Sequence, residues 1–253
     1  MTARTAIELV EPPHRVTRTE PIRSTSPVAS IGQPQVAVLF DFNGVVADDE
    51  PVHFQAFQGV LATAGFRMTA EEYRRYLGLD DRSVFEAFLA HHEIALVPSP
   101  LHHWVRSKQV AYDQLTRGGV HLFPGARELI LALARAGAPL AIVSGARRAE
   151  IERVLTAAAL DACFATIVGI EDVTCPKPDA AGYQLAFERL RARFHETRAG
   201  VAIEDAPAGV IAARAAGLSC IAVTTTCTPA ELRGADRVID SLKEIHLDVT
   251  ACP

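Results

Sequence analysis

Residues 36–50 read VAVLFDFNGVVADDE, and this stretch decides the fold. The apolar run from Val36 to Phe40 leads into Asp41, then through Gly44 into a cluster of acidic residues. A continuous apolar run is typical of a strand that is buried on both faces. Open α/β sheets bind their ligands at the carboxyl ends of such strands. The stretch therefore predicts that Asp41 stands at the ligand-binding edge of a parallel sheet.

From Gln35 onward, apolar strands alternate with amphipathic helices, which is the pattern of a parallel sheet covered by helices. The remaining strands are predicted at 138–143, 165–169, 201–203, 219–223 and 237–239. The helices between them are predicted at 126–136, 149–157, 180–193 and 208–216. The expected core is an α/β, Rossmann-like parallel sheet.

Residues 51–118 interrupt this alternation with a helical period and no strand pattern. Four helices are predicted there, at 53–64, 70–77, 82–91 and 101–116. We therefore expect an inserted all-helical cap over a core formed by 35–50 and 119–253. Residues 1–34 are rich in Pro, Thr, Ser and Arg without sustained periodicity, and we expect a flexible tail.

The composition excludes some partners. The net charge is -5 and no basic run is present, so we expect no nucleic-acid partner. No apolar run approaches the ~20 residues of a membrane span. The 5 cysteines are an odd number without metal-ligand spacing, which indicates free thiols in a reducing compartment. We expect a cytoplasmic protein that is a monomer or a weak dimer.

The basic residues are strongly biased toward arginine. Among 25 Lys and Arg residues, the lysines are only Lys108, Lys177 and Lys243, and Asn43 is the sole asparagine of the chain. A lysine or asparagine that persists against this bias is a better candidate for a chemical role than one in an unbiased sequence.

Four segments carry a family resemblance, each at the end of a predicted strand or in the loop after it. They are Asp41 to Asp49, Ile142-Val143-Ser144-Gly145, Pro176-Lys177-Pro178-Asp179 and Ile203 to Val210. Together they resemble the haloacid dehalogenase superfamily of phosphohydrolases over residues 36–240. The continuation Pro51-Val52-His53 is similar to the beta-phosphoglucomutase and small-sugar-phosphatase branch. The resemblance implies a Mg²⁺-dependent phosphomonoesterase that acts on a small phosphorylated metabolite through an aspartyl-phosphate at Asp41.

The acidic residues of these segments fit a magnesium site. A phosphomonoester is a dianion, so a carboxylate nucleophile needs a cation to shield it. Mg²⁺ prefers hard oxygen ligands and binds through few carboxylates. We expect Asp41, Asp205 and the backbone carbonyl of Asn43 to be ligands, with Glu204 holding a metal-bound water. Glu204 as a purely structural acid remains an alternative.

The phosphate itself is expected to meet Ser144, the amides around Gly145, and Lys177. A hydroxyl and backbone amides can donate hydrogen bonds to phosphate oxygens. Lys177 supplies positive charge that balances Asp41 and the transferring group. Two alternatives stay open: Ser144 can cap the following helix, and Lys177 can be a solvated turn residue.

The cap offers two candidate substrate contacts, His53 and Arg82. The alternatives are an exposed helix histidine and a surface ion pair. Two further pairs, His91-His92 and His102-His103, look like metal ligands. Because adjacent helix residues point in different directions, we predict no metal site at either pair.

Asn43 departs from the resembling family, in which the acid two residues after the nucleophile is the general acid and base. An amide has no titrating proton near neutral pH. We therefore expect metal and phosphate binding to survive and proton transfer to be impaired. Three functions follow: a slow phosphohydrolase, a catalytically impaired phosphate-ligand binding protein, and a sugar phosphomutase. Asn43 counts most against the mutase, which needs a tuned acid and base.

Overall fold

The computed structural model describes residues 31, 35–95 and 98–245. The predicted tail lies outside the described residues except for Ile31, whose side chain is buried in the core. Among the described residues, no helix is both long and apolar enough to cross a membrane.

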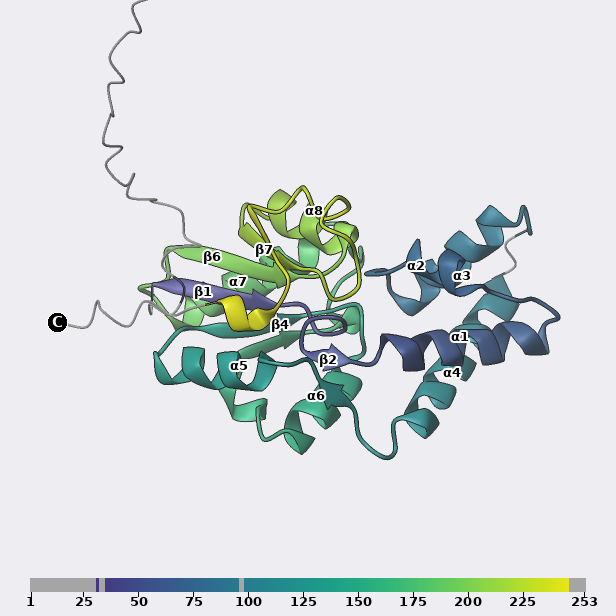
Figure 1. Ribbon diagram of the computed structural model, residues 1–253, viewed down its shortest axis with the longest axis horizontal. Helices are drawn as coiled ribbons and strands as arrows, with labels where there is room; N and C mark the ends of the chain where they lie inside the picture. The colour runs from purple at the N-terminus through teal and green to yellow at the C-terminus, as the bar shows by residue number, and fades with distance from the viewer. Residues whose placement is uncertain (1–30, 32–34, 96–97, 246–253) are drawn as a thin grey trace, which may run out of the picture.

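A six-stranded sheet in the order β5-β4-β1-β6-β7-β8 forms the core (Figure 1). Every neighbouring pair in it is parallel. The strands are β1 (Val36–Phe40), β4 (Leu140–Val143), β5 (Thr166–Val168), β6 (Ala199–Glu204), β7 (Ser219–Val223) and β8 (Arg237–Ile239). The predicted Rossmann-like α/β fold is confirmed, with strand bounds that differ from the predicted ones by a few residues.

Helices cover both faces of the sheet, as the apolar run of β1 predicts. Val38 and Phe40 belong to the hydrophobic cluster beneath α5 (Ala126–Arg135) and α6 (Arg148–Ala157). Leu39 points to the opposite face and packs in a second cluster. Side chains of α7 (Ala181–Arg193) and α8 (Pro207–Ala215) complete that cluster. Burial on both faces leaves only the strand ends for polar side chains.

Four helices form the inserted unit: α1 (Glu50–Thr63), α2 (Ala70–Arg74), α3 (Asp81–His91) and α4 (Pro98–Leu115). They lie to one side of the sheet in Figure 1 and share an aromatic core that includes Phe57, Phe85 and Phe88. Helix α1 begins at Glu50, three residues before its predicted start, because proline is well tolerated in a first helical turn.

The two segments that connect the helical unit to the core pair with each other. β2 (Ala47–Asp48) and β3 (His121–Leu122) form an antiparallel ladder, with Ala47 opposite Leu122. Neither strand was predicted from the sequence, because two residues are too few to show an alternating pattern. The ladder joins the helical unit to the core at one place.

Candidate active site

Three neighbouring strands end at the candidate site. Asp41 follows β1, Ser144 follows β4, and Glu204 is the last residue of β6 with Asp205 next to it. Because β4, β1 and β6 are adjacent and parallel, their carboxyl ends meet at one edge of the sheet. The side chains of Asp41, Glu204 and Asp205 are all buried, and each offers an oxygen within 4.8 Å of the others.

Lys177 reaches these acids from the loop after β5. Its Nζ lies 2.5 Å from Oδ1 of Asp41 and 2.7 Å from Oε1 of Glu204. The hydroxyl of Tyr183 also donates to Oε1 of Glu204, at 2.5 Å. Lys177 is buried, so the alternative of a solvated turn residue is wrong. Glu204 therefore holds the lysine in position and is also one of the three clustered acids that could bind a metal ion.

Asp205 is held by contacts on two sides. The hydroxyl of Thr226 donates to Oδ2 of Asp205, and the backbone of Gly44 passes directly over the carboxylate. A Cβ at position 44 would lie 2.0 Å from Oδ2 of Asp205, and Gly44 also adopts a φ of +81°. Any other residue at position 44 would displace Asp205 from the site.

The charges at this edge do not balance among the protein groups. Three buried carboxylates share one buried cation, Lys177. Burial, partly opposed by Lys177, raises the pKa of Asp41 to about 7. Burial and the neighbouring carboxylates of Asp41 and Glu204 raise the pKa of Asp205 well above its ordinary value. Burial opposes the charged form of Lys177, yet the carboxylates of Asp41 and Glu204 raise its pKa.

This surplus of buried carboxylate oxygen fits a divalent cation that prefers hard ligands. A bound cation would supply the missing positive charge and favour the ionised form of each acid. The donor set contains oxygen and no thiolate or imidazole, which suits a hard divalent cation.

Asn43 is fixed by side chains at the start of α1 and after β4. Its Nδ2 donates to both carboxylate oxygens of Asp49, at 3.0 and 3.1 Å, and its Oδ1 accepts from the hydroxyl of Ser144 at 3.3 Å. Ser144 also accepts from the backbone of Ala146. Arg147 precedes α6, so the alternative that Ser144 caps this helix is wrong.

His53 lies buried at the junction of core and cap, so the alternative of an exposed helix histidine is wrong. Its Nε2 is 3.1 Å from Nδ2 of Asn43, and its ring stacks on Tyr112 with 4.3 Å between centroids. The Nζ of Lys108 lies 2.6 Å from Nδ1 of His53 and 2.5 Å from Oδ1 of Asp81.

The sequence analysis assigned no site role to Lys108, Tyr112, Glu150 or Thr226. A signal for Lys108 was present, since it is one of the few lysines in an arginine-rich chain. Nothing in the local sequence distinguishes the other three from ordinary helix and loop residues.

A cavity of about 460 Å³ separates the strand ends from the helical unit. Asp41, Asn43, Ser144 and Gly145 line its core side, and His53 and Arg82 line its cap side. Arg82 also pairs with Glu86 at 3.5 Å, which is the alternative of a surface ion pair, and its contact with substrate stays a prediction. The loop between α2 and α3 packs closely against the core at Gly145. A Cβ added to this glycine would lie 3.4 Å from the backbone of Asp80.

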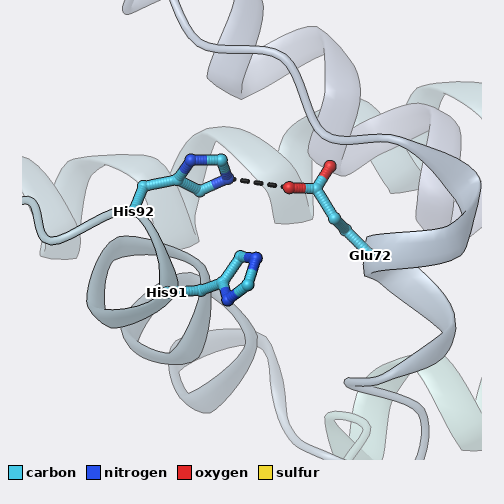
Figure 2. A group of neighbouring side chains, drawn as sticks. All are labelled: Glu72, His91 and His92. Carbon is cyan, nitrogen blue, oxygen red and sulfur yellow. Dashed lines mark hydrogen bonds and ion pairs between the residues drawn. The ribbon is translucent and has the colours of Figure 1, made fainter.

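A second group of metal-type ligands lies within the cap, between α2 and α3 (Figure 2). Oε1 of Glu72 accepts a hydrogen bond from Nε2 of His92 at 2.8 Å. A ring nitrogen of His91 lies within 4.8 Å of both. The two histidines can approach the same carboxylate because His91 is the last residue of α3 and His92 lies just beyond the helix. The directions expected for adjacent residues within a helix do not apply there. Oε2 of Glu72 is already engaged with Thr69 in capping α2.

Comparisons with known proteins agree with this geometry. The family model described as "Haloacid dehalogenase-like hydrolase" matches residues 38–223. Protein CbbY of Cereibacter sphaeroides is 32% identical over 227 residues, which are 85% of this chain and 97% of that protein. A phosphorylated carbohydrates phosphatase of Thermotoga maritima is 28% identical, over 73% of this chain and 83% of that protein.

A solved structure extends the match to three dimensions. CbbY from Rhodobacter sphaeroides, crystallised in complex with phosphate, superimposes with a TM-score of 0.72 at 30% sequence identity. The superposition covers 84% of this chain and 96% of CbbY. The similarity therefore includes both the sheet and the inserted helices.

Proposed function

The chain belongs to the haloacid dehalogenase-like hydrolase family, and on this premise we propose that it is a phosphomonoesterase for small phosphorylated sugars. The relative from Thermotoga maritima is named for phosphorylated carbohydrates, and the CbbY structure holds phosphate. The proposal transfers this class of substrate to the cavity above Asp41.

The observation that carries the proposal is the buried contact of Asp41 with Lys177 at the floor of the cavity. Nζ of Lys177 lies 2.5 Å from Oδ1 of Asp41, which leaves Oδ2 of the same carboxylate for attack. The lysine charge would also balance the negative charge that develops on the phosphoryl oxygens. A buried nucleophile beside a fixed cation is the arrangement that covalent catalysis needs.

We propose that Mg²⁺ binds to Asp41, Asp205 and the backbone carbonyl of Asn43, with Glu204 nearby. When bound, it would shield the phosphate dianion from the carboxylates and polarise a phosphoryl oxygen. The excess of buried carboxylates over lysine supports this assignment.

In the first step, a carboxylate oxygen of Asp41 bonds to phosphorus while the bond from phosphorus to the ester oxygen breaks. Ser144 and the amides near Gly145 orient the phosphoryl oxygens, and both residues line the cavity. Water then attacks the aspartyl-phosphate and releases phosphate. Closure of the cap, residues 51–118, would exclude other water from Asp41 during the first step.

Asn43 should slow both steps, since its amide neither protonates the leaving oxygen nor activates water. General acid–base catalysis typically contributes 10²–10⁴-fold, or roughly 3–5 kcal/mol. Its loss would leave a slow enzyme, because the other groups of the site are present. A binding protein with negligible turnover and a sugar phosphomutase are the rival functions.

Phosphate release from a panel of sugar phosphates, measured with and without Mg²⁺, tests the proposal. We expect release that depends on Mg²⁺ and disappears in the Asp41→Asn variant. Binding of the same esters without release would favour the binding protein. A requirement for a sugar bisphosphate activator would favour the mutase.

A further inference from the structure

The lining of the cavity beyond the strand ends is rich in acids, which come from both the cap and the core. Apart from Asp41 and the histidine His53, the charged lining consists of five acids and two arginines. They are Glu50, Asp80, Asp81, Glu86, Glu150, Arg82 and Arg147. This balance disfavours a second anionic group on the substrate.

The cations near this wall already have acidic partners. Arg82 pairs with Glu86 at 3.5 Å, and Arg147 pairs with Asp113 at 3.1 Å. Lys108, which lies behind the wall, pairs with Asp81 at 2.5 Å. Among the described residues that line the cavity, no lysine or arginine is left without an acidic partner to bind a distal phosphate.

Glu150 lacks the donors that a buried carboxylate needs. Its side chain is 4% exposed, and its Oε1 has no hydrogen-bond partner. The nearest cationic atom to Oε1 is Nε2 of His53 at 3.5 Å, and that nitrogen lies equally far from Oδ2 of Asp49. The other oxygen, Oε2, is 3.6 Å from Arg147, beyond normal hydrogen-bond range.

Glu50 is a second acid of this lining, and its carboxylate has one hydrogen-bond donor. Its Oε2 accepts from the hydroxyl of Tyr73 at 2.6 Å, and no ion pair of Glu50 is found among the described residues. Burial raises the pKa of both Glu50 and Glu150, as expected for carboxylates with too little compensation. A positively charged group in the cavity would supply a hydrogen-bond donor to Glu150 and a counter-charge to Glu50.

We propose that this cavity selects phosphomonoesters whose organic part carries a protonated amine, such as amino sugar phosphates, and that Glu150 accepts a hydrogen bond from the ammonium. The inference rests on the proposed phosphomonoesterase function and specifies its substrate class. An ammonium donates up to three hydrogen bonds and accepts none. It therefore matches a cavity lined by carboxylate oxygens that have few donors. A second phosphate would meet like charge instead.

Two matched pairs of esters test the selectivity. Glucosamine 6-phosphate differs from glucose 6-phosphate only by an amine in place of a hydroxyl, and the corresponding 1-phosphates place that amine at another distance from phosphorus. We expect kcat/KM for the amine of at least one pair to exceed that of its hydroxyl partner by roughly 10-fold or more, the scale of a charge-assisted hydrogen bond. Fructose 1,6-bisphosphate should be the poorest substrate.

The variant Glu150→Gln keeps the shape of the side chain and removes its charge, so it should abolish the amine preference. Glu86→Gln is the matched control, because Glu86 lines the same cavity from a more exposed position and already pairs with Arg82. This control should retain the preference. Equal rates within both pairs in the wild type, or an undiminished preference in Glu150→Gln, would overturn the inference.

Failure of the inference and failure of the proposed function give different results. Release of phosphate without an amine preference rejects only the inference. If none of these esters nor p-nitrophenyl phosphate is hydrolysed, the proposed function fails. Calorimetric binding of the same pairs to the Asp41→Asn variant then decides the amine preference without any need for turnover.

Discussion

The side-chain amide of Asn43 lies 3.0 Å from Oδ1 of Asp49, a carboxylate that is fully buried at the junction of core and cap. The hydroxyl of Tyr112 donates to the same carboxylate at 2.5 Å. The site therefore contains a carboxylate next to position 43, although the side chain at position 43 is itself an amide.

Asn43→Asp should raise phosphatase turnover by at least ~10-fold, toward the 10²–10⁴ typical of acid–base catalysis. The new carboxyl at position 43 would stand beside Asp49, and repulsion between like charges would raise its pKa and favour a proton donor near neutral pH. The gain should be smaller for p-nitrophenyl phosphate than for an alkyl phosphate, since nitrophenolate leaves without a proton. Steady-state kinetics on both substrates measure this.

The double variant Asn43→Asp with Asp49→Asn is the matched control. It exchanges the carboxyl and the amide between the two positions, so net charge and composition stay constant. It should also gain activity, because the acid now stands beside the nucleophile. If neither variant is faster on any substrate, the missing acid at position 43 is not what limits the enzyme.

Asp205→Asn should weaken Mg²⁺ binding strongly, because it removes one of two expected direct carboxylate ligands. Lys177→Ala should largely spare Mg²⁺ and impair phosphate binding or turnover. Isothermal titration with Mg²⁺ separates the two variants. An Mg²⁺ affinity of Asp205→Asn within about twofold of the wild type, or roughly 0.4 kcal/mol, would contradict the assigned metal site.

Glu150→Gln should stabilise the fold relative to the wild type, and this gain in stability should grow as pH rises. The pKa of Glu150 is raised above its ordinary value of 4.5 by burial, so the folded state holds a proton that the unfolded chain releases. The wild type therefore loses stability as pH rises from about 4.5 through the folded pKa, and the glutamine variant avoids this loss. Thermal melts at pH 5 and pH 8 should show the larger gain in Tm at pH 8, and a gain independent of pH would argue against a strained carboxylate.

The cap should move relative to the core about the two linkers near 47–51 and 116–123. The two-residue ladder of β2 and β3 lies within these linkers and is the one sheet that connects the described helical unit to the core. Small-angle scattering with and without Mg²⁺ and a metal fluoride phosphate mimic measures the change. The account expects compaction on binding, and identical profiles at saturating ligand would count against it.

Much of the sheet edge was predictable because local patterns determine it. The apolar runs of β1 and β6 are followed at once by Asp41 and by Glu204 with Asp205, and parallel pairing brings those ends together. The contacts made by the cap could not be predicted in the same way. Glu150 looks like an ordinary helix acid in sequence, and only the tertiary structure places it 3.5 Å from His53.

Asn43 illustrates the same limit. The family resemblance predicts an acid at this position, but the sequence does not show which neighbour accepts a hydrogen bond from the amide of Asn43. Asp49 was one of several acids in the same short segment, and the start of α1 directs its carboxylate to Asn43. Side-chain direction at a helix start depends on tertiary packing, which the linear pattern does not encode.

Formation of an aspartyl-phosphate at Asp41 is the central claim, and acid quenching followed by peptide mass mapping tests it most directly. The wild-type protein is incubated with Mg²⁺ and acetyl phosphate, quenched in acid and digested, with Asp41→Asn as the control. We predict a phosphoryl adduct on Asp41 that is absent from the control and lasts longer in the wild type than in Asn43→Asp, since attack by water lacks a base. Phosphate release without any adduct at Asp41, or an equal adduct in the control, would contradict the account.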